Sequence, residues 1–188
     1  MQRDSERIYD EFLVTASAAG DRQAWDRLVG RWQPRLLRHA WRVLGDAELG
    51  RDVVQEAWLE ILRGLVRLDD PAAFRAWAFR IVSRRCYRVM AGRAREPFDP
   101  EEAGIGAEPV VPEHATAAFA SDLDKVMAAV AVLPPAQRAA LALYHLEGMG
   151  VAEIAVSLDV PPGTVKTRLM HARRKVREQL EGGRNGQV

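Results

Sequence analysis

The sequence predicts an all-α protein made of two small helical bundles joined by a flexible acidic linker, with a helix-turn-helix in the C-terminal bundle. Two observations predict this fold class. No segment of the 188 residues alternates apolar and polar side chains as a strand does, whereas apolar residues recur at spacings of three and four. A stretch rich in proline, glycine and acidic residues interrupts the helical pattern and divides the chain in two. We expect a first domain over 1–95, a linker over 96–120, a second domain over 121–182 and a flexible tail over 183–188.

The helix ranges follow from apolar periodicity and from the residues that cap or open helices. Asp21 and Asp46 are typical N-cap residues, because a short carboxylate accepts hydrogen bonds from the free N–H groups of a first turn. Helices are expected over about 21–44, 46–65, 71–91, 121–133, 135–148, 151–158 and 164–180, with a shorter one before them that carries Ile8 and Phe12.

Composition and charge argue against a membrane-spanning or disulfide-stabilised protein and indicate which parts of the chain bind a polyanion. No apolar run approaches the roughly 20 residues of a membrane span, and the charged N-terminus does not resemble a secretory signal. The single cysteine, Cys86, excludes an intrachain disulfide framework, so we expect a cytoplasmic protein. The net charge is +1, but 1–95 carries +5 (18 Arg, 13 acids), 96–120 carries −6 (no base, six acids) and 121–188 carries +2 (nine bases, seven acids). This distribution predicts that the two basic blocks, and not the acidic strip, bind a polyanion.

The helix expected over 71–91 carries a basic stripe. Seven arginines and no acidic residue lie between Arg75 and Arg95. An aromatic ring beside guanidinium groups can stack on unpaired bases while the charges bind phosphates. The alternative is a solvated polar face with one core tryptophan, but a merely soluble helix usually mixes both signs of charge. The stripe, at spacings i, i+3, i+7 and i+11, consists of Trp77, Arg80, Arg84 and Arg88.

The stretch over 151–180 is typical of a helix-turn-helix, although an ordinary surface hairpin is the simpler alternative. A short helix is followed by a stiff turn with two prolines, and then by a helix with six Lys or Arg residues between Lys166 and Arg177. Asp159 stands where the turn often requires a positive φ. We expect the second helix to present Thr167, Arg168 and His171 at its exposed centre, where such side chains contact base edges. The full set of expected DNA contacts is Thr164, Lys166, Thr167, Arg168, His171, Arg174 and Lys175.

The helix over 46–65 carries one further candidate surface, and the sequence shows no grouping of residues typical of a catalytic or metal site. Asp52, Gln55 and Glu56 lie together on the helix over 46–65, away from its apolar stripe; they form either a docking patch for a basic partner or a solvated face. The four histidines are scattered, and only Ser83 beside two arginines suggests a nucleophile. We therefore expect no catalytic, metal or cofactor site.

In their order and spacing these motifs resemble those of the extracytoplasmic-function (ECF, group IV) sigma factors of bacterial RNA polymerase. Three segments carry the resemblance, which covers nearly the whole chain: DAELGRDVVQEAWLEIL, DPAAFRAWAFRIVSRRCYRV and LPPAQRAALALYHLEGMGVAEIAVSLDVPPGTVKTRLMHARRKVREQL. They are similar to the segments of that family that dock on the polymerase clamp, open and read the −10 element, and read the −35 element.

The resemblance implies a non-enzymatic initiation factor without an added sensory domain. Its partners would be core RNA polymerase, through the clamp and flap regions, promoter DNA and an anti-sigma factor. Asp52, Gln55 and Glu56 match the clamp-contact positions, and the loop over 68–75 matches the one that takes up a flipped −10 base. The residues implied at the −10 element are Phe74, Arg75, Trp77, Arg80, Arg84 and Arg88.

Three residues depart from the family pattern, and two other functions stay open. Arg84 stands where asparagine is frequent, Asp159 replaces the usual turn glycine, and His171 occupies a position often held by arginine. The alternatives are a stand-alone helix-turn-helix repressor or activator that binds a palindrome as a dimer and, less favoured, a site-specific recombinase.

Overall fold

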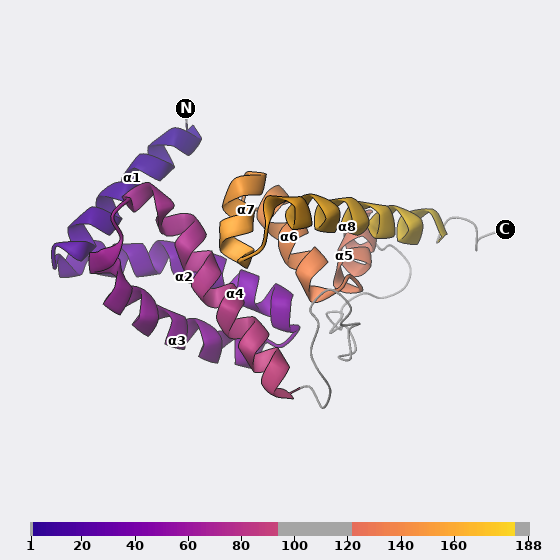
Figure 1. Ribbon diagram of the computed structural model, residues 1–188, viewed down its shortest axis with the longest axis horizontal. Helices are drawn as coiled ribbons and strands as arrows, with labels where there is room; N and C mark the ends of the chain where they lie inside the picture. The colour runs from indigo at the N-terminus through magenta and orange to yellow at the C-terminus, as the bar shows by residue number, and fades with distance from the viewer. Residues whose placement is uncertain (1, 94–121, 183–188) are drawn as a thin grey trace.

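The computed structural model describes residues 2–93 and 122–182, and every regular element in these ranges is helical. The expected all-α fold class is confirmed. The expected linker and tail lie outside the described residues. The elements, labelled in Figure 1, are α1 (Gln2–Ala18), α2 (Arg22–Leu44), α3 (Ala47–Gly64), the short 3₁₀ helices η1 (Leu65–Arg67) and η2 (Pro71–Ala73), α4 (Phe74–Arg93), α5 (Asp122–Ala131), α6 (Pro135–His145), α7 (Val151–Leu158) and α8 (Pro162–Gly182).

Local sequence signals set the ends of these helices. The Asp21 carboxylate accepts hydrogen bonds from the N–H groups of Gln23 and Ala24, at 2.8 and 3.1 Å, and Asp46 caps α3 in the same way. α2 ends at Gly45, whose φ of 74° is the left-handed conformation that favours glycine. α8 begins at Pro162, two residues earlier than expected, because proline fits the first turn of a helix.

The first bundle packs around α2, which contacts α1, α3 and α4. Trp32 is at its centre, with its ring edge-on to Phe74 at 5.2 Å and to Phe79 at 6.0 Å between centroids. Such edge-to-face pairs add about 0.5–1.5 kcal/mol to the free energy gained by burying the rings. α4 therefore turns its apolar side toward α2 and leaves its basic stripe at the surface.

The second bundle packs α6, α7 and α5 against α8. The buried residues of α6 include Ala136, Ala139 and Ala140, whose small side chains allow close approach of neighbouring helices. The helix-turn-helix is formed by α7 and α8, with Ile154 and Leu169 in the buried cluster.

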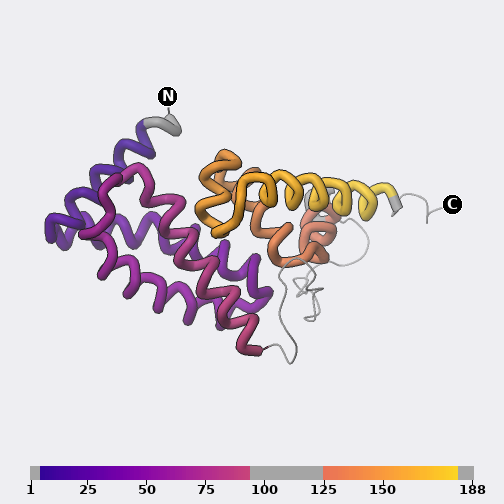
Figure 2. Tube along the Cα trace, in the orientation of Figure 1, coloured from indigo at the N-terminus to yellow at the C-terminus, as the bar shows by residue number. Residues whose placement is uncertain are grey.

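The two bundles lie against each other. α7 packs along α4 and α6 packs against α2 (Figure 1; Figure 2), so one buried apolar cluster runs from Leu13 in α1 to Leu169 in α8. Both expected DNA-reading helices, α4 and α8, thus belong to one packed body. None of the helices in the described ranges is both long and apolar enough to cross a membrane.

Candidate nucleic-acid interface

The aromatic member of the α4 stripe is packed against α3. The Trp77 ring lies over Gly64, and a Cβ at Gly64 would come within 2.7 Å of ring atom Cζ2. Trp77 is half-buried and packs against the buried apolar cluster. Glycine at position 64 is therefore required by the closeness of the ring.

Carboxylates of other elements pair with the arginines of the stripe. Arg80 donates to the carboxylate of Asp159, in the turn between α7 and α8, at 2.8 Å. Arg84 pairs with Glu60 of α3. Arg88 is exposed, and no ion pair of its side chain is found among residues 2–93 and 122–182. The stripe is thus on one face of the helix, as predicted, but two of its three arginines already form ion pairs with carboxylates.

Two other residues expected at the −10 element lie elsewhere. Phe74, which was expected at the −10 element, is only 2% exposed and packs on Trp32, so its side chain faces the core at the first turn of α4. Arg75 is half-buried, and burial lowers the pKa of its guanidinium, an effect that the carboxylates of Glu153 and Glu147 oppose. Its Nε has no hydrogen-bond partner within residues 2–93 and 122–182.

α8 presents a cationic face whose rotation differs from the one expected. Arg168 is 5% exposed, so its predicted place at the exposed centre is wrong. It lies three residues after Val165 and four before Ala172, both buried, and so it shares their inward-facing stripe. Between Val165 and Arg177, the exposed residues of α8 are Lys166, Thr167, Met170, Arg173, Arg174 and Arg177.

Met170 lies in the middle of this exposed arc and is 58% exposed. Sequence reasoning missed it, although its apolar side chain between basic neighbours was a visible signal. Of the other expected contacts, Thr167 is exposed, and its hydroxyl donates to the Gly163 carbonyl at 3.1 Å. Three more are partly exposed, namely Thr164, His171 and Lys175.

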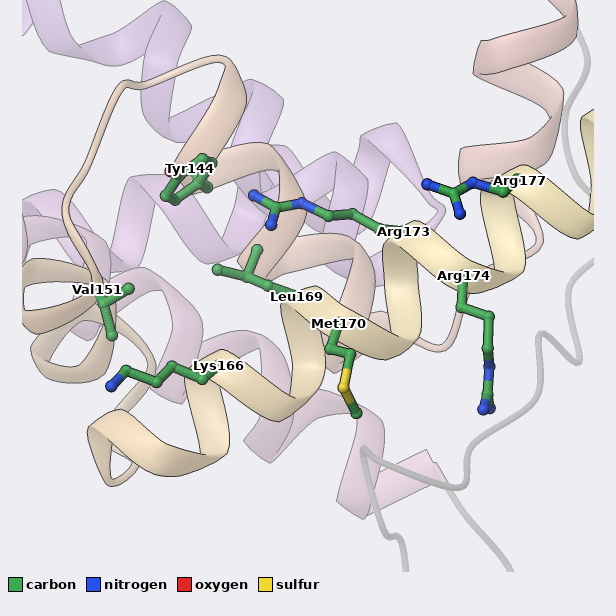
Figure 3. Close-up of a pocket in the computed structure, with 8 residues that line it drawn as sticks. All are labelled: Tyr144, Val151, Lys166, Leu169, Met170, Arg173, Arg174 and Arg177. Carbon is green, nitrogen blue, oxygen red and sulfur yellow. The ribbon is translucent and has the colours of Figure 1, made fainter.

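A groove of about 470 Å³ runs beside this face, between α6, α7 and α8. Figure 3 shows Arg173 reaching from α8 toward Tyr144 of α6, while Met170 and Arg174 point away from that ring. The Arg173 guanidinium lies 5.0 Å from the centroid of the Tyr144 ring, within cation–π distance. The groove therefore has an apolar floor and a cationic rim, and its lining residues are Tyr144, Val151, Lys166, Leu169, Met170, Arg173, Arg174 and Arg177.

Comparison with known proteins decides the family. The Sigma-70 region 2 family matches residues 28–96, and the Sigma-70, region 4 family matches residues 123–176. The RNA polymerase sigma-H factor of Pseudomonas aeruginosa is 31% identical over 181 residues, which are 92% of this chain and 94% of that protein. The ECF RNA polymerase sigma factor SigE of Mycolicibacterium smegmatis is 33% identical, over 91% of this chain and 69% of its own. The chain belongs to the ECF sigma factors of RNA polymerase.

Solved structures agree with this assignment at the level of the fold. The sigma factor RpoE of Bartonella quintana, solved in complex with the anti-sigma factor NepR, matches with a TM-score of 0.65 at 22% identity, over 84% of this chain and 96% of that one. CnrH, solved in complex with the cytosolic domain of CnrY, matches with a TM-score of 0.63 at 22% identity, over 93% and 98%. Family matches in both halves do not favour the alternative of a stand-alone helix-turn-helix regulator.

The sigma factor has a third surface, on α3. Asp52, Gln55 and Glu56 are exposed there and lie on one face of the helix, as predicted. Glu56 also pairs with Arg85 of α4. Three large apolar side chains, which the sequence analysis did not include, continue the face toward η1: Leu59, Leu62 and Val66, at 52%, 50% and 73% exposure. Successive steps of three, three and four residues from Glu56 to Leu59, Leu62 and Val66 were the signal that could have identified them.

Proposed function

We propose that this sigma factor uses three surfaces in sequence. The outer face of α3 docks on core RNA polymerase, the stripe of α4 binds the opened −10 strand, and the exposed arc of α8 reads the −35 element in the major groove. One observation carries the proposal: two separate cationic faces, each on its own helix, occur in one chain that matches both DNA-reading families of sigma-70. The factor itself catalyses no reaction, and it works where the polymerase works, in the cytoplasm.

The docking surface combines charge with apolar area. Leu59, Leu62 and Val66 expose apolar side chains next to the carboxylates of Asp52 and Glu56. Interfaces usually bury an apolar centre within a polar rim, and rim charges act mainly on the association rate. We propose that the apolar residues supply most of the affinity for core polymerase and that the acids orient the encounter.

At the −10 element, we propose that the opened strand is bound by Trp77, Arg80, Arg84 and Arg88. The indole of Trp77 lies close to Gly64 at its Cζ2 and Cη2 atoms and is half-buried, and we propose that its exposed part stacks on an unpaired base. Arg80 and Arg84 must exchange carboxylate partners for phosphates when the strand binds. Both pairs are exposed, and exposed ion pairs contribute only about 0–1 kcal/mol, so this exchange costs little.

At the −35 element the proposal follows the observed rotation of α8. Lys166, Arg174 and Thr167 are exposed on either side of Met170, and side chains of these types can contact phosphates and base edges. An apolar side chain among donors in the major groove is suited to contact the methyl group of thymine. We propose Met170 as such a contact and remove Arg168 from the base-reading set.

Control by a protein partner is also part of the proposal. The structures of RpoE and CnrH that share this fold were solved with an anti-sigma factor and with the cytosolic domain of CnrY, respectively. We propose that an anti-sigma factor binds this chain too, over surfaces that core polymerase and DNA would otherwise use.

Reconstitution tests the proposed function. Core RNA polymerase is mixed with the purified full chain and a library of templates randomised at the two promoter elements, and transcripts are sequenced. We expect initiation from a restricted set of templates with fixed spacing between two elements, absent with core enzyme alone. Transcripts that do not depend on the added chain, or that show no sequence preference, would contradict the proposal.

A further inference from the structure

The contact between the two bundles has an electrostatic pattern. The segment 147–159 brings three carboxylates, those of Glu147, Glu153 and Asp159, to the arginine-rich surface of α2 and α4. Asp159 pairs with Arg80 at 2.8 Å. Glu153 and Glu147 oppose the burial that lowers the pKa of Arg75, and Glu147 does the same for Arg42. Carboxylates of the second bundle thus act on three guanidinium groups of the first, those of Arg80, Arg75 and Arg42.

Asp159 is unusual in its backbone as well as in its charge. Its φ is 57°, and it is the only non-glycine residue with a positive φ among residues 2–93 and 122–182. The conformation ends α7, and the N–H of Val160 donates to the Ala155 carbonyl at 3.0 Å. Glycine adopts this conformation at lower cost, so the turn alone does not explain an aspartate. The carboxylate extends to Arg80 on the other bundle, and this pair gives the residue a role that glycine could not have.

We propose that Asp159 is an intrachain latch: its carboxylate occupies the Arg80 guanidinium and holds the two bundles together while no DNA strand is bound. The apolar packing of α7 on α4 supplies the rest of the closed arrangement. A strand phosphate and the Asp159 carboxylate have the same charge, so they compete for Arg80. The latch rests on the proposed function only in assigning Arg80 to the DNA strand.

The expected size of the effect follows from exposure. The side chains of Arg80 and Asp159 are 45% and 58% exposed. Pairs of this kind change an equilibrium constant by about 1.5- to 5-fold, and salt screens them. Loss of the latch should therefore shift the balance of closed and open forms measurably and leave each bundle folded.

The test measures distances in the full chain. Spin labels are placed at Leu62→Cys on α3 and Gln179→Cys on α8, both exposed positions, while native Cys86 is buried and stays unlabelled. The variant is Asp159→Asn, which has the same size, tolerates positive φ and lacks the charge. Arg80→Gln removes the other partner, and Arg88→Gln is the control, because it removes an exposed arginine of the same stripe outside the latch. Binding of single-stranded dT12 is measured in parallel.

At about 50 mM salt we expect Asp159→Asn and Arg80→Gln each to raise the open fraction by about 1.5- to 5-fold, with no further gain in the double variant. High salt should bring wild type close to Asp159→Asn, and Arg88→Gln should leave the distances unchanged. Asp159→Asn should also bind dT12 more tightly. Equal distance distributions for wild type and Asp159→Asn would overturn the latch. Altered distances with unchanged dT12 affinity would support the latch and contradict the proposed role of Arg80 in strand binding.

Discussion

The buried imidazole of His39 makes the stability of the first bundle sensitive to acid. The residue is 2% exposed, and its Nε2 lies 2.8 Å from the Ser83 hydroxyl oxygen. That hydroxyl donates its proton to the Phe79 carbonyl at 2.8 Å, so its oxygen accepts from Nε2–H. Burial, together with the positive charge of Arg42, lowers the pKa of His39 from 6.5 to about 3. The folded protein therefore keeps this ring neutral throughout the mildly acidic range.

The sign and size of the effect follow from proton linkage. In the unfolded chain the pKa of His39 is about 6.5, so the unfolded state takes up the proton first as the pH falls. The stabilisation is complete above about pH 6.5 and is lost as the pH falls toward 3. At pH 5 the unfolded state gains about 2 kcal/mol relative to pH 7 from this one group, because the folded pKa of about 3 lies well below 5.

Urea unfolding, followed by circular dichroism at pH 7 and pH 5, measures this contribution. In His39→Gln the drop in the free energy of unfolding between the two pH values should be smaller than in wild type by about 2 kcal/mol. The carboxylates contribute equally to the pH dependence of unfolding in both proteins, so their contribution cancels when the two drops are compared. His145→Gln, at an exposed position, is the matched control and should retain most of the wild-type drop. An equal drop in wild type and His39→Gln would refute the argument from burial.

Three further predictions concern the proposed surfaces. Charge reversal at Asp52 and Glu56 should slow association with core polymerase in a stopped-flow assay and leave helical content unchanged; an unaltered rate would remove these acids from the docking surface. Gly64→Ala should displace the indole beside it and lower the free energy of unfolding by about 1–3 kcal/mol. Gly30→Ala, in open space on α2, should instead raise the free energy of unfolding by about 0.5–1 kcal/mol. A change of the same sign in both variants would contradict the close contact at Gly64. When a contacted −35 thymine is replaced by uracil, the wild-type protein should lose about 0.8 kcal/mol of binding free energy, and the Met170→Ala variant should lose none. Equal losses in the two proteins would show that Met170 does not contact that methyl group.

The elements that the sequence predicted well are those set by neighbouring residues. Asp21 and Asp46 cap α2 and α3 through N–H groups two and three positions away, and Asp159 adopts the positive φ expected of it. α7 spans Val151–Leu158, the range expected from apolar spacing and the prolines that follow. Such signals need no knowledge of the tertiary structure, so a single sequence is enough to place them.

The rotation of α8 and the contact between the bundles depend on distant residues. Lys and Arg occur on several sides of α8, so charge alone could not show which side faces inward. Arg168 is buried because a long aliphatic stem can line a core as readily as it can extend into water. The fit of Trp77 to Gly64 and the bond from His39 to Ser83 join segments that periodicity treats separately.

The absence of acids between Arg75 and Arg95 favours nucleic-acid binding when the sequence is considered alone, and the structure gives that observation a second cause. The missing carboxylates come from other elements: Glu60 of α3 pairs with Arg84, and Asp159 pairs with Arg80. A helix of one charge is thus not evidence that its charges lack partners. These pairs are exposed, so each contributes only about 0–1 kcal/mol to the free protein, whereas a phosphate strand also gains from the release of its counterions. Weak internal pairs of this kind keep the arginines ordered and still allow DNA to replace the carboxylates, so a matched stripe is compatible with strand binding.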